Sequence, residues 1–197
     1  GTDTQVVEIT VTGSNDAPVA KDANFTVKED GELIGSLEAI DPDNGDTINI
    51  AIAAGGDPTS GAVEILSPDK DNPKFRFKYK PKADFFGSDS FEFRVEDSFG
   101  ATSTAKINLD ITPVNDAPIA LADAATVKEG ETTTVDVLGN DLDIEGDLLS
   151  INSVSTSELG DVSISADGKN IIFDANSSKV NALKVGEVLS EVLFYDI

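Results

Sequence analysis

The stretch Asn15-Asp16-Ala17-Pro18-Val19-Ala20 recurs as Asn115-Asp116-Ala117-Pro118-Ile119-Ala120, 100 residues further along the chain. At the same offset, Thr26-Val27-Lys28-Glu29 recurs as Thr126-Val127-Lys128-Glu129. Two matches in the same order and at the same spacing indicate a tandem structural repeat. We therefore take a unit of about 100 residues as the basis of the domain organisation.

Both ends of the chain fit this unit. Residues 1–12 resemble residues 102–112, so we interpret them as the last strand of a preceding repeat. Residues 194–197 resemble residues 92–95, and the chain stops before the counterpart of the final strand. We predict three segments: 1–14, the last strand of a preceding repeat plus a linker; 15–113, a complete repeat; and 114–197, a second repeat truncated before its final strand.

The pattern within the unit is that of β-strands. Apolar and other residues alternate with period two in residues 5–11, 75–79, 91–95 and 105–111, which is typical of half-buried antiparallel strands. Only residues 177–191 leave a short helix or a loop as alternatives. About seven short strands in a unit of this length predict an all-β fold of tandem immunoglobulin-like, antiparallel β-sandwiches.

Composition restricts the chemistry. The 197 residues include no Cys and no His, which excludes a disulfide framework, a thiolate nucleophile, Ser-His-Asp catalysis and His-bound zinc. The net charge of −23 argues against binding to nucleic acid or to anionic lipid, and no apolar run is long enough for membrane insertion. Paired carboxylates can cleave glycosides, but here they recur at repeat junctions, so we predict that the chain is not an enzyme. The oxygen ligands that remain suit hard cations such as calcium.

The acidic residues gather where strands are expected to end. Asp41-Pro42-Asp43-Asn44-Gly45-Asp46 alternates oxygen ligands and includes a Gly that permits a sharp turn, as a calcium loop requires; an ordinary Asp/Asn/Gly turn is the alternative. The other acidic positions also have structural alternatives. Glu29 suits a solvated edge-strand carboxylate, Asp84 a turn cap, and Asn115-Asp116 a linker turn. Recurrence at the 100-residue offset favours a shared function in cation binding.

These motifs resemble the bacterial cadherin-like, VCBS-type immunoglobulin-like tandem repeats of large surface adhesins of the RTX-adhesin type. Glu29 and Glu129 each lie eleven residues after a linker proline, Asp41 and Asp43 form an Asp-x-Asp, and residues 113–118 match most of the family's linker. The resemblance departs at Pro113 and Ala117, where cadherins carry ligands. Fewer ions, or weaker binding, are therefore expected than at a vertebrate junction.

The resemblance implies calcium as the cofactor, bound between consecutive repeats. The implied ligands are Glu29, Asp84, Asn115, Asp116, Asp141 and Asp143 at the junction of the two repeats, Asn15, Asp16, Asp41 and Asp43 as half of an upstream junction, and Glu129 at a downstream one.

The expected function follows from this resemblance. We expect a calcium-stiffened stalk repeat of a secreted or cell-surface bacterial adhesin, serving cell or surface adhesion and biofilm formation, with neighbouring repeats of the same chain as partners. A carbohydrate-binding or homophilic cell–cell contact module is the alternative, and an exposed Phe85-Phe86 pair would favour it.

Separately, residues 5–11 have the sequence of a closing strand, so they could be donated to the second repeat in cis or in another molecule; a frayed terminus is the other interpretation.

Overall fold

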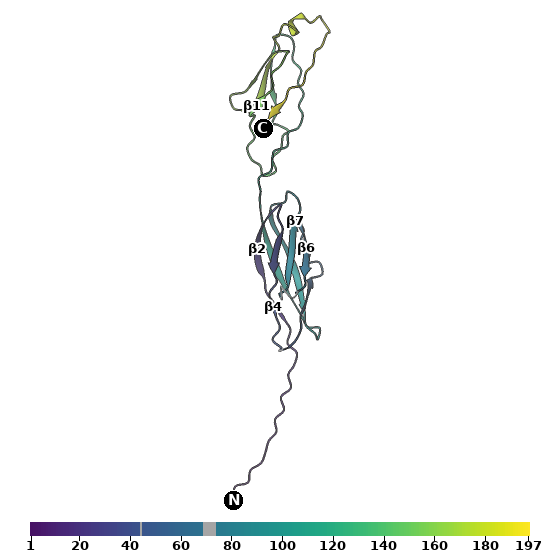
Figure 1. Cartoon of the computed structure of the whole chain (residues 1–197), viewed down its shortest axis with the longest axis vertical. Coiled ribbons are helices and arrows are strands. Elements are labelled where there is room, and N and C mark those ends of the chain that lie inside the picture. Colours follow the sequence, from purple (N-terminus) through teal and green to yellow (C-terminus); the bar gives the residue numbers. More distant parts are fainter. Residues whose placement is uncertain (44, 69–73) are drawn as a thin grey trace. The chain divides into compact units, whose positions relative to one another are not determined.

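The computed structural model describes residues 1–43, 45–68 and 74–197, and the chain divides into two compact units, Gly1–Val114 (unit 1) and Asn115–Ile197 (unit 2) (Figure 1). Asn44 of the predicted calcium loop lies outside the described residues. The strands of unit 1 are β1 (Val19–Ala20), β2 (Ala23–Lys28), β3 (Leu33–Ser36), β4 (Ala39–Ile40), β5 (Asn49–Ile52), β6 (Gly61–Leu66), β7 (Arg76–Pro81), β8 (Gly87–Glu96) and β9 (Thr102–Thr112). Unit 2 contains β10 (Thr132–Asp136), β11 (Ser153–Val154), β12 (Asp161–Ile164), β13 (Asn170–Asp174), the 3-10 turn η1 (Val180–Ala182) and β14 (Tyr195–Asp196).

Unit 1 is a two-sheet sandwich. One sheet has the order β2-β9-β8-β5, the other has the order β3-β7-β6, and β1 pairs separately with β4. The described pairs are antiparallel, as predicted, except that β2 runs parallel to β9. Alternation predicts that a strand is half buried, but it carries no information about the direction of a partner so far away in sequence. The parallel pair places the first long strand of unit 1 beside its last.

The core of unit 1 lies between these sheets and is rich in aromatic residues. Phe77, Tyr79 and Phe93 are fully buried, and the β9 residues Ile107, Leu109 and Ile111 are at most 2% exposed. The Phe77 ring meets the rings of Phe25 and Phe91 edge-on, with centroid separations of 5.1 and 4.9 Å. Aromatic pairs prefer this edge-to-face arrangement.

Glycine makes room for these rings at one position in particular. Gly35 in β3 is the direct cross-strand partner of Phe77 in β7. A Cβ atom at Gly35 would lie 2.3 Å from the Phe77 ring, so the close approach of the two strands requires a residue without a side chain.

Unit 2 repeats the smaller sheet of unit 1. Its order β10-β13-β12 matches β3-β7-β6, with Thr133 and Val162 opposite Phe173 in the places where Leu33 and Val63 are opposite Tyr79. The second sheet is represented, among the described residues, by the short β11–β14 pair, which corresponds to β5–β8. The buried core is correspondingly small and consists of Val137, Ile151 and Ile171 with partly buried neighbours.

Three segments differ from what alternation predicts. Residues 1–17 carry no strand, although 5–11 alternate (Figure 1). Residues 123–128, the counterparts of β2, also carry none. Residues 177–191 are loop apart from η1. Extended segments form strands only where a neighbouring strand satisfies their backbone groups.

No helix in the described part of the chain has the length and apolar character that a membrane span requires.

Candidate metal centre

The predicted calcium loop of unit 1 follows β4 directly. The backbone amide of Asp43 donates to Asp41 Oδ1 at 2.8 Å, which forms an Asx-type turn. Gly45 has a φ of 96°, a conformation that favours glycine. The backbone amide of Asp46 returns to the Asp43 carbonyl at 3.3 Å. This turn brings three carboxylates to one side of the loop.

The carboxylates of Asp41, Asp43 and Asp46 each offer an oxygen within 4.8 Å of the others. Two ligands of one calcium ion, at about 2.3–2.6 Å each, lie at most about 5 Å apart, so the spacing fits a shared cation. Asp41 Oδ2 and Asp46 Oδ2 are buried and accept no hydrogen bond. Buried carboxylate oxygens usually have a donor or a metal as partner.

Two further oxygens of this group accept hydrogen bonds from residues outside the loop. The backbone amide of Asp16 donates to Asp43 Oδ2 at 2.7 Å, and Ser98 Oγ donates to Asp46 Oδ1 at 3.0 Å. The predicted ligands Asp16 and Asp43 are thus brought together, although Asp16 contributes its amide. The hydroxyl and amide donors orient the carboxylates without occupying their remaining lone pairs.

A fourth carboxylate, Asp97, supports this end of unit 1. Its exposed fraction is 6%, and Asn15 Nδ2 donates to Asp97 Oδ2 at 2.9 Å. The Asn15 hydrogen bond, together with the backbone amides of Ala101 and Phe99, holds the pKa of Asp97 below its usual range. The predicted ligand Asn15 is therefore anchored by Asp97, which carries its charge at neutral pH.

The equivalent loop of unit 2 is arranged differently. The amide of Asp147 donates to Asp143 Oδ1 at 2.9 Å, which repeats the tight acidic turn. Asp141 accepts a hydrogen bond from the Leu121 amide at 2.7 Å and from the Tyr195 hydroxyl at 3.1 Å. Burial, followed by the hydrogen bond to Asp141, raises the pKa of Tyr195 to about 12. Both oxygens of Asp141 thus have protein donors.

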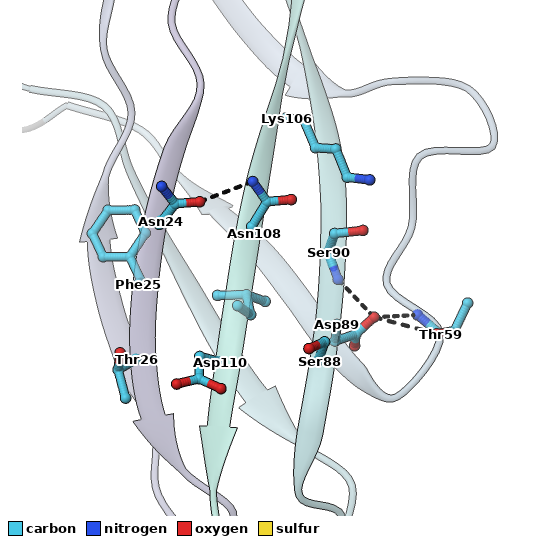
Figure 2. Close-up of a pocket in the computed structure, with 11 residues that line it drawn as sticks. Asn24, Phe25, Thr26, Thr59, Ser88, Asp89, Ser90, Lys106, Asn108 and Asp110 are labelled. Atoms are coloured by element: carbon cyan, nitrogen blue, oxygen red, sulfur yellow. Dashed lines mark hydrogen bonds between the residues drawn. The ribbon is translucent and has the colours of Figure 1, made fainter.

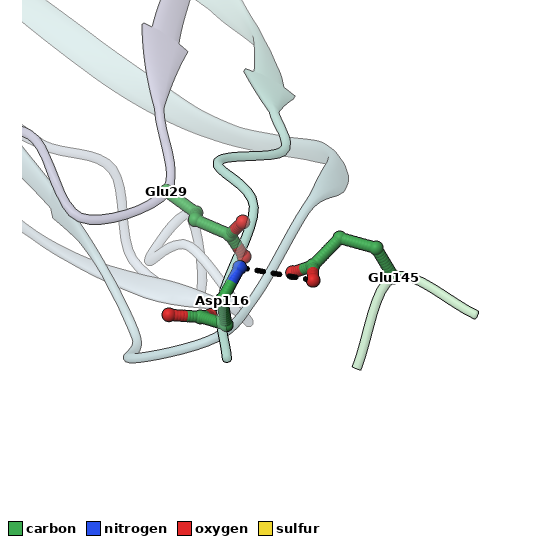
Figure 3. A group of neighbouring side chains, drawn as sticks. All are labelled: Glu29, Asp116 and Glu145. Atoms are coloured by element: carbon green, nitrogen blue, oxygen red, sulfur yellow. Dashed lines mark hydrogen bonds between the residues drawn. The ribbon is translucent and has the colours of Figure 1, made fainter. Parts of the chain in front are cut away.

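Glu29, the predicted ligand after β2, is 2% exposed. Its Oε1 accepts the backbone amide of Val114 at 2.7 Å, and its Oε2 is buried with no hydrogen-bond partner. In unit 2, the amide of Asp116 donates to Glu145 Oε2 at 3.1 Å (Figure 3). Asn115 Nδ2 donates to the Asp116 carbonyl at 2.9 Å.

Two predicted ligands lie outside these groups. Asp84 is exposed in the turn before β8, with a φ of 56°, and Glu129 is exposed in the turn before β10. Asp46 joins the site of unit 1 although it is not among the predicted ligands. Asp97, also not among them, supports the site through its hydrogen bond with Asn15. Asp46 lies within the predicted loop, whereas Asp97, just after β8, has no motif of its own.

A polar groove of about 650 Å³ lies over the exposed face of β2, β9 and β8 (Figure 2). Asn24 and Asn108 are joined across it by a 2.9 Å hydrogen bond between their side chains. Lys106, Ser90 and Asp110 also line it. The groove therefore presents amide, hydroxyl and charged groups beside apolar surface from residues such as Phe25 and Leu109.

The Phe85-Phe86 pair divides between core and surface. Phe85 packs against the core of unit 1, and Phe86 is 39% exposed. The pair therefore offers no continuous aromatic platform.

Comparison with known proteins identifies the family of the repeat. The sequence matches the family model of the bacterial Ig domain over residues 15–110 and 115–185. The chain belongs to the bacterial Ig domain family. Bacterial Ig domains of this sandwich type are typical of extracellular, adhesion-type modules, which are generally not enzymes.

Individual proteins similar to this bacterial Ig domain chain come from several sources. Integrin beta-like protein A of Dictyostelium discoideum is 30% identical over 134 residues, which cover 61% of this chain and 7% of that relative. The solved structure of protocadherin gamma B7 extracellular cadherin domains 1–4 is 14% identical, with a TM-score of 0.47, over 82% of this chain and 41% of that one. The human desmocollin-1 ectodomain is 14% identical, with a TM-score of 0.37, over 82% and 34%.

Proposed function

We propose that this chain is a calcium-binding structural repeat of a bacterial extracellular adhesin, part of a stalk that calcium stiffens and that serves cell or surface adhesion and biofilm formation. The observation that carries the proposal is the cluster of three carboxylates formed by Asp41, Asp43 and Asp46. Two oxygens of this cluster are buried and accept no hydrogen bond. Like charges this close repel each other, and a divalent cation converts that repulsion into attraction.

The acidic pair recurs in sequence where the repeat recurs. Asp141 and Asp143 repeat Asp41 and Asp43 in sequence, and Glu29 holds the amide of Val114, the last residue of unit 1. The linker residues Asn115 and Asp116 follow immediately. We propose that the predicted ligands of this linker region bind calcium together, which would restrict motion of one repeat against the next.

The donor set suits calcium better than softer metals. Carboxylate and backbone oxygens are hard ligands, and the chain has no Cys or His to favour zinc or copper. The net charge of −23 also concentrates divalent cations near the surface, so a specific site has to be distinguished from general screening.

The test is thermal unfolding with calcium chloride, with a chelator, and with sodium chloride at matched ionic strength. A ligand that binds only the folded state at 100 times its Kd stabilises by about 2.7 kcal/mol, so calcium should raise the melting temperature beyond the sodium control. Titration calorimetry should show saturable binding that Asp41→Asn and Asp46→Asn abolish in unit 1. Asp110→Asn, an exposed carboxylate on β9, is the matched control. Absence of binding at millimolar calcium would overturn the proposal.

A second candidate, carbohydrate binding, is favoured by the polar groove over β2, β9 and β8. Amide and hydroxyl groups such as those of Asn24, Asn108 and Ser90 are suited to the hydroxyls of a sugar. Binding of a polysaccharide that is lost in Asn24→Ala and Asn108→Ala, and kept in the calcium-loop variants, would support this candidate. Binding that survives both groove substitutions would count against it.

A further inference from the structure

The positive charge of this acidic chain is concentrated in and around β7. Five of the 14 Lys and Arg residues occupy alternate positions within residues 74–82: Lys74, Arg76, Lys78, Lys80 and Lys82. Phe77 and Tyr79, which lie between them, are fully buried. Because successive side chains of a strand point to opposite faces, the cations lie on the outer face of the smaller sheet. We call these five residues the basic row.

The place of β7 in its sheet excludes one simple explanation of the basic row. Lysines often protect the exposed edge strands of a sheet against pairing with other chains. β7, however, lies between β3 and β6, and it pairs with both of them. Its backbone groups are therefore already satisfied by neighbouring strands, and edge protection does not account for the cations.

Neighbouring carboxylates neutralise only part of the basic row. The carboxylates of Glu32 and Glu64 lie 3.9 and 3.5 Å from the same amine, Lys78 Nζ. Lys82 Nζ donates a hydrogen bond to the neutral Thr59 carbonyl at 2.7 Å. Lys80 is exposed and forms no ion pair with any described residue. The face of β7 therefore keeps an excess of positive charge.

The repeat fold does not require these cations. In unit 2, β13 is the equivalent of β7, and Phe173 has the place of Tyr79. The same register puts Ile172 in the place of Lys78 and Asp174 in the place of Lys80. The acidic loop pair recurs in both repeats, whereas the basic row belongs to unit 1 alone, which points to a separate role.

The spacing of the basic row suits an extended polyanion. Alternate residues of a strand are about 6.8 Å apart, so Arg76, Lys78 and Lys80 span about 14 Å along β7. A polymer with anionic groups along its length can contact several of these cations at once, whereas a small anion contacts one or two. At physiological ionic strength charges beyond about 8 Å are largely screened, so the acidity of the rest of the chain does not cancel this local attraction.

The surroundings of the basic row favour a polysaccharide over a nucleic acid. Ile34 is opposite Lys78 in β3 and is 55% exposed, which offers an apolar contact to the C–H face of a sugar ring. Single-stranded nucleic acid is usually held by aromatic side chains that stack on its bases. The aromatic rings of Phe77 and Tyr79 in β7 are instead buried in the core.

We propose that the outer face of β7 binds a linear anionic polysaccharide, whose carboxylate or sulfate groups pair with Lys78 and Lys80 beside Ile34. The basic row contains none of the predicted calcium ligands, and it lies on the sheet opposite the polar groove over β2, β9 and β8. Binding at β7 is therefore separable from both functions considered above.

Binding of the full chain to three immobilised polymers tests this surface: alginate, which carries carboxylates, dextran sulfate, and neutral dextran. A chelator is present throughout, so that calcium cannot bridge two anionic groups. We expect at least one of the two polyanions to bind, with an affinity that falls as sodium chloride is raised, and dextran not to bind. The preferred polyanion identifies carboxylate or sulfate as the ligand group. Failure of both polyanions to bind at low salt would overturn the proposal.

Charge-neutral variants locate the contact. Lys78→Gln combined with Lys80→Gln should weaken polyanion binding about tenfold or more and reduce the slope of log affinity against log salt by about one per lysine. Lys80→Arg, which keeps the charge, should retain binding. Lys80→Gln should leave the melting temperature unchanged, because Lys80 is exposed and without an ion pair among the described residues.

Two lysines of the other sheet are the matched controls. Lys28→Gln in β2 and Lys106→Gln in β9 remove the same charge from exposed positions, and both should retain polyanion binding. Equal weakening by Lys28→Gln would show a general effect of net charge, and loss in Lys106→Gln alone would place the ligand in the polar groove. Oligothymidylate that binds through Lys78 and Lys80 more tightly than either polyanion would identify a nucleic-acid surface. Each of these three results would overturn the proposal.

Discussion

At the scale of single residues, the carboxylate of Asp89 shows how a charge is kept in the core of unit 1. It is 8% exposed and accepts hydrogen bonds from the Tyr79 hydroxyl, at 2.7 Å, and from the Ser60 amide. The amide of Thr59 also donates to it (Figure 2). Burial raises the pKa of Asp89, but these hydrogen bonds outweigh it and leave the pKa below its ordinary value. The ionised carboxylate therefore stabilises the folded state.

We predict that Asp89→Asn destabilises unit 1 by about 1–3 kcal/mol at neutral pH, because buried donors lose a charged acceptor. The folded pKa lies below the unfolded value of about 3.9, so the stabilisation is present above that pH and is lost as the pH falls through the folded pKa. Denaturant unfolding at a series of pH values should show the two proteins converging in acid. Asp110→Asn should change stability by less than about 0.5 kcal/mol. A pH-independent difference would refute this account of Asp89.

At equivalent positions of their smaller sheets, the two repeats pair different residues across adjacent strands. Gly35 is opposite Phe77 in unit 1, whereas Val135 is opposite Ile171 in unit 2. Gly35→Val alone should destabilise by about 1–3 kcal/mol through overpacking. Adding Phe77→Ile should restore part of the loss, giving a non-additive double-mutant cycle measured by denaturant unfolding. Strict additivity would show that the two positions do not share this space.

The sequence patterns indicated some of the site and core carboxylates and missed others. The 100-residue offset pointed to Asp41 and Asp43, which the structure brings together with Asp46. Alternation along β8 continues back from Phe91 to Asp89, so the pattern contained a signal for a carboxylate facing the core. The partners of Asp97 depend on loops folding back against each other, which short motifs do not encode.

At the scale of elements, alternation predicted the long strands well and the short ones poorly. The predicted strands 75–79, 91–95 and 105–111 correspond to β7, β8 and β9. The parallel pairing of β2 with β9 was not predictable, because a strand's pattern records which face is buried and says nothing of its neighbour's direction. Residues 5–11 show the converse, a strand pattern without a strand.

Hydrogen exchange should reveal this difference between elements. Amides of β9 have strands on both sides, so those of Ile107 and Leu109 should exchange only through global unfolding of unit 1. Residues 123–128 lie in no strand, so their amides should exchange close to the unfolded rate. Comparable protection of both segments would contradict the pairing described here.

At the scale of the whole molecule, the two units have cores of very different size. Among the described residues, twelve buried side chains form the main hydrophobic cluster of unit 1, against three in that of unit 2. We expect calorimetry to show two unfolding transitions, with unit 2 melting first. Phe91→Ala should destabilise unit 1 by about 3–5 kcal/mol and so lower only the upper transition temperature. Ile171→Ala should lower only the transition temperature of unit 2. A single transition that both variants shift equally would show that the units unfold together.

The parallel pair of β2 and β9 gives unit 1 a mechanical property. Tension applied through the chain on either side passes the short strand β1, reaches the start of β2 and leaves at the end of β9, so it pulls β2 and β9 past each other along their length. All six residue pairs from Ala23–Ile107 to Lys28–Thr112 are then loaded at once, whereas an antiparallel terminal pair would open one bond at a time from its end. The order of the strands in this sheet thus makes the unit resist stretching in the direction in which a tethered chain is pulled.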